Sequence, residues 1–106
     1  MFFDDLGSLT NEILATEHGS FLIVADNREQ AVFLLGEVAR AINNRTEEMS
    51  NLRFRPHPML QMMDRDVRIL AVEQASMYRV RGFTFDGAFA GINLEEQVAP
   101  LLRFKE

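Results

Sequence analysis

Apolar residues follow two different spacings along the chain, and the two spacings separate helices from strands. Leu6, Leu9 and Ile13 recur every three or four residues, which predicts an amphipathic helix over about residues 4–17. The next apolar run, FLIVA at residues 21–25, is continuous. A short continuous run is typical of a strand that is covered on both faces, as in a parallel sheet.

A long helix is predicted after this first strand. Asp26 or Asn27 can cap its first turn, with Glu29 or Gln30 placed as in a capping box. The helix should run to about residue 44. Its apolar face is marked by Val32, Leu35, Ala39 and Ile42, and it is broadened by Ala31, Leu34 and Val38.

The second half of the chain is less regular. Residues 45–58 are polar and contain two prolines, which argues against a long regular element there. The segment MLQMMDRD at residues 59–66 is expected to form one or two helical turns, and VRILAVEQ at residues 67–74 is expected to form a second strand. A third strand is expected over residues 84–92, followed by a helix that is disturbed at Pro100.

Strands that alternate with helices indicate an α/β fold. We expect one small three-layer domain over residues 1–106, in which a mostly parallel sheet of three or more strands is flanked by helices.

Composition narrows the range of functions. Sixteen acidic against eleven basic residues give a formal charge of -5, which argues against a general nucleic-acid binder. The absence of cysteine excludes disulfides and thiol nucleophiles. No apolar run reaches the length of a membrane span, and the acidic start MFFDDLGS does not fit an export signal. A cytoplasmic protein that does not associate with membranes is therefore expected.

The order of elements resembles that of P-loop NTPases, most closely the helicase and phage-terminase type. Arg81 and Gly82 match an Arg-Gly pair that precedes a strand in that branch, Asp86 matches an early acid, and GINLEE at 91–96 falls where metal-binding acids would stand. The resemblance spans about residues 20–97. It implies a degenerate P-loop-like domain, encoded by a phage or another mobile element.

The chain departs from that family at the residues that carry out its chemistry. No Gly-x-x-x-x-Gly-Lys-Ser/Thr motif is present, and the lone lysine is Lys105. Asn93 stands where the first metal-binding acid is expected. The strand that should precede the first helix is missing, unless the residues MFF at 1–3 are its remnant. Autonomous ATP hydrolysis is not expected, and no cofactor is predicted.

Four residues form a candidate degenerate acidic site: Asp86, Asn93, Glu95 and Glu96. One interpretation is a site for a divalent metal or phosphate. The favoured interpretation makes Asn93 the N-cap of the last helix and puts Glu95 and Glu96 in its first turn, where acids stabilise the positive end of the helix dipole. The two histidines lack the spacing of metal ligands, and no serine lies in a G-x-S-x-G motif.

Arginines and methionines suggest a candidate interaction surface. The arginines alternate in LRFRP and YRVRG, so each pair would point one way if extended, and with Tyr78 they could contact single-stranded nucleic acid. Nearby acids could instead pair with them on a solvated face, which is the favoured interpretation. Met59, Met62 and Met63 would share a helical face, either in the core or against a partner. The candidate residues are Arg53, Arg55, Arg79, Arg81, Met59, Met62 and Met63.

Together these features predict a small acidic binding protein without catalytic activity that acts through protein–protein contacts. A domain that lacks a strand would expose a sheet edge, so a homodimer or an obligate protein partner is expected. One alternative is an inhibitor that occupies the nucleic-acid-binding surface of a larger enzyme. Another is a nucleotide-binding enzyme subunit that is completed by a second chain. A local arginine patch leaves nucleic-acid binding open.

Overall fold

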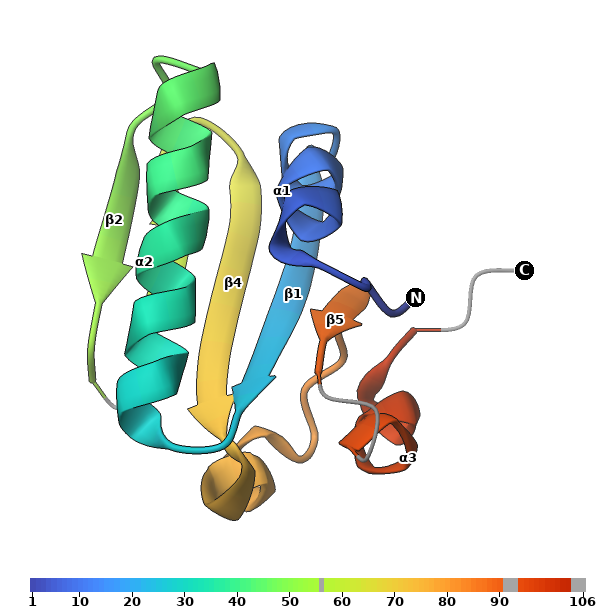
Figure 1. Ribbon diagram of the computed structural model, residues 1–106. Coiled ribbons are helices and arrows are strands. Elements are labelled where there is room, and N and C mark those ends of the chain that lie inside the picture. Colours follow the sequence, from blue (N-terminus) through green and yellow to red (C-terminus); the bar gives the residue numbers. More distant parts are fainter. Residues whose placement is uncertain (56, 91–93, 104–106) are drawn as a thin grey trace.

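The computed structural model describes residues 1–55, 57–90 and 94–103, and these form an α/β fold around one five-stranded sheet (Figure 1). In chain order the elements are α1 (Leu6–Leu14), β1 (His18–Ala25), α2 (Arg28–Arg45), β2 (Ser50–Arg53), β3 (Met59–Met62), β4 (Asp66–Glu73), the 3₁₀ helix η1 (Gln74–Val80), β5 (Gly87–Phe89), α3 (Glu95–Val98) and the 3₁₀ helix η3 (Ala99–Leu101). None of the helices in this described part is long and apolar enough to cross a membrane.

The sheet has the strand order β2-β3-β4-β1-β5 and is mixed. β1 pairs in parallel with β4 and with β5, whereas β3 pairs antiparallel with β2 and with β4. The expectation of a mostly parallel sheet was therefore wrong. The β2–β3 hairpin supplies the antiparallel part, in a region where the sequence predicted a loop and helical turns.

The segment MLQM forms β3 because its burial alternates with a period of two. Leu60 and Met62 are buried, whereas Met59 and Gln61 are only partly buried. Alternate residues of a strand point to opposite faces, so Met62 and Met59 lie on opposite faces of the sheet. The predicted helical face of Met59, Met62 and Met63 does not exist. Hydrogen bonds to β2 and β4 decided the conformation of this segment over its helical spacing.

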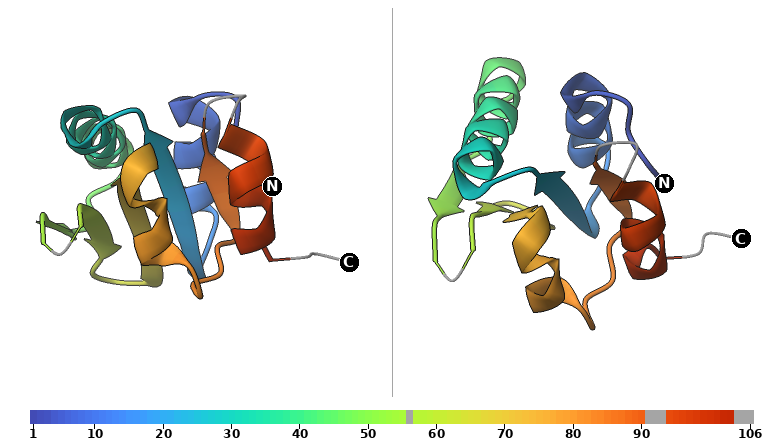
Figure 2. Two further views of the ribbon diagram at one scale, coloured as in Figure 1. Left: turned by 90° about the horizontal axis from the view of Figure 1, so that it is seen from below. Right: turned by 60° about the horizontal axis from the view of Figure 1, so that its bottom comes forward.

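Helices cover both faces of the sheet, which gives the expected three layers (Figure 2). α1 and α2 pack on one face, where buried side chains from α1, α2, β1, β3 and β4 form a single hydrophobic cluster. η1 and α3 lie on the other face over a second cluster that includes Leu22, Leu70 and Phe85. Alternate residues of β1 and β4 enter the two clusters, which explains their continuous apolar sequences.

Local capping fixes the beginnings of the two main helices. The Asp5 carboxylate accepts a hydrogen bond from the Ser8 amide at 2.7 Å, and this bond lowers the pKa of Asp5. In α2 the Asn27 side chain accepts from the Gln30 amide at 2.8 Å, while the Gln30 side chain accepts from the Asp26 amide at 2.9 Å. The predicted cap by Asn27 is therefore confirmed, whereas Gln30 accepts from the amide before the N-cap residue and not from that of Asn27, as a capping box would require.

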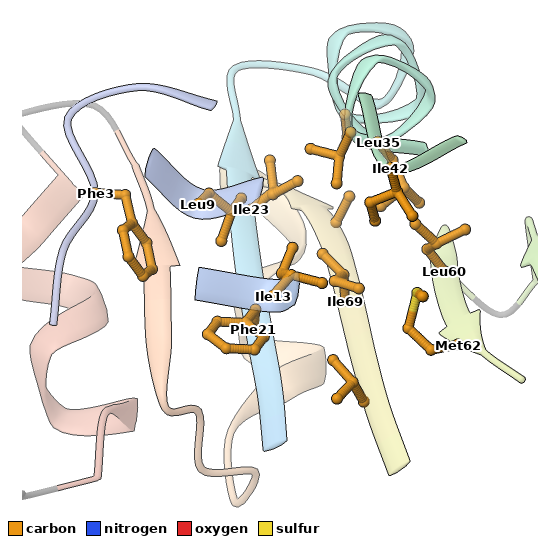
Figure 3. Packing of buried hydrophobic residues seen from close by; sticks show 14 of the residues in the cluster. Phe3, Leu9, Ile13, Phe21, Ile23, Leu35, Ile42, Leu60, Met62 and Ile69 are labelled. Atoms are coloured by element: carbon orange, nitrogen blue, oxygen red, sulfur yellow. The ribbon is translucent and has the colours of Figure 1, made fainter. Parts of the chain in front are cut away.

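The larger cluster fills the space between the sheet and the first two helices (Figure 3). Leu9 and Ile13 of α1 reach Phe21 of β1, while Leu35 and Ile42 of α2 lie over the β3–β4 part of the sheet. These side chains are buried at the positions that the helical spacing predicted. This packing fixes the ends of β1 and β4 relative to α2.

The N-terminal residues add a short parallel segment beside β5. The Phe3 amide donates to the Ala88 carbonyl at 2.9 Å, and the Ala88 amide donates to the Met1 carbonyl at 3.0 Å. The residues MFF therefore do occupy a strand position before the first helix. The predicted third strand over residues 84–92 is reduced to Gly87–Phe89, and residues 91–92 of that prediction lie outside the described residues.

Candidate functional site

Asp86 lies at the amino end of β5 and is bonded within the fold. Its Oδ2 accepts a hydrogen bond from the Ser20 amide of β1 at 2.9 Å, and its Oδ1 lies 3.4 Å from Nη1 of Arg103. A Cβ added to Gly19 would lie 2.7 Å from Oδ2, so only glycine allows this close approach. Asp86 therefore joins β5 to the start of β1.

The other members of the candidate acidic site lie near the carboxyl ends of β1 and β5 or outside the described residues. Glu95 and Glu96 form the first turn of α3. The preceding Leu94 lines a cleft together with Val24 and Phe89, which belong to the carboxyl ends of β1 and β5. Asn93 lies outside the described residues. Asp86 is thus separated from the two glutamates by the length of the strand, and the structure does not bring them together.

The four candidate arginines belong to two separate regions. Arg53 ends β2 and Arg55 follows it in a bend, and both are exposed. Arg79 lies in η1 and Arg81 directly after it. Because YRV continues a 3₁₀ helix, Arg79 and Arg81 do not alternate as they would in the extended segment that the sequence suggested. No carboxylate within the described part of the chain lies within 4.0 Å of any of the four.

The candidate methionines also divide between the core and the surface. Met62 is buried in the larger hydrophobic cluster, and Met59 packs against the smaller one. Met63 is exposed, and its amide donates to the Met49 carbonyl at 2.9 Å. Met49, which the sequence did not single out, is 71% exposed. Met49 and Met63 are therefore opposite each other on the uncovered face of the β2–β3 hairpin.

The two histidines lie at opposite ends of the strands β1 and β4. Nδ1 of His18 is 3.7 Å from Asp66, and both side chains are exposed at the amino ends of β1 and β4. His57 lies before β3, where burial and then the nearby Arg79 charge lower its pKa. Within the ranges that the structure describes, no group of three or more His, Asp or Glu side chains could hold a metal ion.

The carboxyl end of β4 borders a cavity of about 260 Å³. Ala31 of α2 and Ala71 and Val72 of β4 line its floor and are almost completely buried. Its polar side chains come from α2, the hairpin, β4 and η1, namely Arg28, His57, Glu73, Ser76 and Arg79. No local pattern in the sequence groups these residues. Arg28 and Glu73 could have been grouped, because each stands just after the apolar residues of a predicted strand. Parallel strands end on the same side of a sheet, so the residues that follow them lie close together.

Arg65 is a further polar residue that the sequence analysis missed. Its side chain is only 8% exposed, and Nε lies 3.0 Å from the Glu48 carboxylate. Nη1 donates to the carbonyls of Ile13, Leu14 and Thr16, at distances between 2.8 and 3.1 Å. Arg65 thus binds the carbonyl groups of Leu14 and Thr16 after α1, and it shares the Ile13 carbonyl with the Thr16 amide, which donates to it at 3.2 Å. No local pattern marked it, because all of its partners are distant in sequence.

Comparison of the chain with protein-family models, with curated proteins and with solved structures finds no match. The resemblance to P-loop NTPases therefore stays a prediction.

Proposed function

We propose that the chain is a protein-interaction module without catalytic activity, and that it assembles with a second copy of itself through the open edge of β2. The observation that carries this proposal is the self-complementary pattern of backbone and side-chain groups along that edge. The lack of catalytic activity is supported by the absence of a Walker A motif and by the bonding of Asp86 to Ser20.

The outer edge of β2 offers backbone groups to a partner. Met63 and Met49 form a hydrogen-bonded pair, and such pairs alternate along an antiparallel ladder. Asn51 and Arg53 therefore bond to β3, while Ser50 and Leu52 direct their N–H and C=O groups away from it. Among the described residues, β3 is the one strand that pairs with β2. Beyond Leu52 the next outward carbonyl, that of Phe54, already accepts a hydrogen bond from Arg28 at 2.8 Å.

The register of the open residues suits antiparallel pairing with an identical strand. Ser50 of each copy would lie opposite Leu52 of the other, and each pair would exchange both backbone hydrogen bonds. In this register Asn51 of one copy lies opposite Asn51 of the other, and Arg53 of each copy lies opposite Met49 of the other. Arg55 comes near Glu47 at both ends, which matches opposite charges across the two-fold axis.

Exposed apolar side chains surround this edge and support a docked partner. Leu52 is 36%, Phe54 46%, Met63 58% and Met49 71% exposed. Methionine adapts to a partner surface at small energetic cost, and the stem of Arg53 can cover Met49. An exposed apolar edge strand is prone to pair with another chain, so a two-fold dimer would protect it from open-ended association.

Light scattering over a range of protein concentrations tests this proposal. We expect a reversible monomer–dimer equilibrium in the micromolar range. Arg55→Glu places like charges opposite each other at both ends of the paired strands, and it should raise the dimer dissociation constant by about tenfold. The double variant Glu47→Arg/Arg55→Glu restores opposite charges and should recover most of the affinity.

The control is Arg81→Glu, which makes the same change of charge after η1, away from β2. It should leave the dimer dissociation constant unchanged. A wild-type chain that stays monomeric at hundreds of micromolar would refute the proposal. The same holds if Arg55→Glu and Arg81→Glu weaken the dimer equally, or if the double variant does not recover.

A further inference from the structure

We propose that the cavity at the carboxyl end of β4 is a binding site for a small phosphate-bearing molecule, held by Arg28 and Arg79. This site lies apart from the open edge of β2 and does not depend on dimer formation.

The charge of the cavity favours an anion. Arg28 and Arg79 contribute two positive charges, and Glu73 contributes one negative charge. The cavity thus carries a net positive charge in a chain whose formal charge is -5. Glu73 already accepts a hydrogen bond from the Ser76 hydroxyl at 3.1 Å. A phosphate group would neutralise the positive charge that Glu73 leaves uncompensated.

Both guanidinium groups keep donors for a ligand. Nη2 of Arg28 donates to the neutral Phe54 carbonyl, and Nε of Arg79 donates to the Tyr78 hydroxyl at 3.2 Å. A guanidinium has five N–H donors, and its planar shape matches two phosphate oxygens. The partners of these arginines among the described residues leave most of the donors free. This distinguishes them from Arg65, whose Nε and Nη1 are bonded within the fold.

The size and lining of the cavity restrict the ligand. A volume of about 260 Å³ is below that of most sites for drug-sized ligands, so a short phosphate monoester fits better than a dinucleotide. Ala31, Ala71 and Val72 line the cavity but are almost completely buried, so its accessible groups are mainly polar. The position also fits the general rule that ligands of open α/β sheets bind outside the carboxyl ends of the strands, where neighbouring connections leave on opposite faces. Here β1 leads to α2 on one face and β4 leads to η1 on the other (Figure 2).

His57 reports on the occupancy of this cavity. The charged groups that line the cavity with it are Arg28 from α2, Glu73 from β4 and Arg79 from η1. The Arg79 charge contributes to the lowered pKa of His57. A bound phosphate would offset that charge and raise the pKa of His57 toward its ordinary value. By linkage, phosphate binding and protonation of His57 should favour each other.

The experiment is an NMR titration of both histidine rings with inorganic phosphate, with sodium chloride added to hold ionic strength constant. We expect saturable shifts of the His57 signals and a rise in its pKa. His18 is an internal control, because it lies at the amino end of β1, at the opposite end of the strands from the cavity. Arg28→Gln and Arg79→Gln should each weaken phosphate binding at least about tenfold. Arg81→Gln, which removes a neighbouring charge outside the cavity, should bind phosphate as the wild type does.

The amide spectrum of each variant shows whether the fold is retained. Arg79→Gln is the safer variant, because within the described part of the chain Arg79 donates to the Tyr78 side chain, whereas Arg28 donates to the backbone carbonyl of Phe54. Equal, unsaturated shifts of both histidines would show that phosphate acts only through general screening and would overturn the proposal. Unchanged phosphate affinity in a folded Arg79→Gln variant would also overturn it.

Discussion

At the amino ends of β1 and β4 two charged side chains, Arg65 and Asp86, are bonded within the fold, whereas at the carboxyl end of β4 Arg28 and Arg79 line an open cavity. Arg65 and Asp86 each join segments that are distant in sequence, and both are largely buried. Among the described residues, Arg28 donates to a carbonyl and Arg79 to a hydroxyl. We therefore expect the two ends of these strands to have separate roles. We expect substitutions of Arg65 and Asp86 to lower the free energy of unfolding. We expect substitutions of Arg28 and Arg79 to change ligand binding.

The largest expected effect follows from removal of Arg65. Arg65→Met removes the donor of the Leu14 and Thr16 carbonyls and the partner of the Glu48 carboxylate. It should lower the free energy of unfolding by about 3 kcal/mol, as measured by urea denaturation. Arg68→Met is the matched control, because Arg68 is exposed on β4, and it should cost less than about 0.5 kcal/mol. Equal effects of the two substitutions would remove the distinction between buried and exposed charges at this end of the strands.

A smaller effect is expected at Asp86, where a double-mutant cycle can sharpen the comparison. Asp86→Ala removes the acceptor of the Ser20 amide and should cost about 1–2 kcal/mol. Gly19→Ala should also destabilise the wild type, because its Cβ would meet the Asp86 carboxylate. In the Asp86→Ala background that cost should fall by about 1 kcal/mol. Additive effects in urea denaturation would show that the close approach of Gly19 to Asp86 does not matter.

The smallest effect concerns the pH dependence of stability through His57. Its pKa in the folded chain is below the ordinary value of 6.5, so the unfolded chain takes up the proton first as the pH falls. The contribution of neutral His57 to stability is therefore present above pH 6.5 and is lost as the pH falls toward the lowered value. The stability of the wild type relative to His57→Gln should decrease slightly between about pH 7.5 and about pH 5 in urea denaturation. An increase over this interval would contradict the direction assigned to the pKa of His57.

The sequence predicted the elements whose signals are long and regular. The helix over Arg28–Arg45 and the strands FLIVA and VRILAVE were confirmed, because continuous apolar runs and a repeated helical spacing leave few alternatives. The hairpin of β2 and β3 was missed. Its strands are four residues long, and the spacing of Met59, Met62 and Met63 also fits a helix. Pairing with β4 decided between them, and a local pattern does not contain that information.

The polar sites could be predicted only in part. Asp86 was singled out for its position before a strand, but its partners Ser20 and Arg103 come from other parts of the chain. The cavity combines side chains from four elements, and its position depends on the strand order, which the sequence did not provide. Local capping of α2 was predicted, because the capping residues are neighbours in sequence.

The parallel pairing of β1 with β4 has a consequence for how the chain folds. Its partners, from His18 and Asp66 to Ala25 and Glu73, lie nearly fifty positions apart. This central contact must therefore close a long loop that contains α2 and the hairpin. Helices and hairpins form within microseconds, whereas pairings between distant segments are slow. The joining of β1 to β4 should therefore limit the folding rate, and until then the apolar FLIVA segment stays exposed to aggregation.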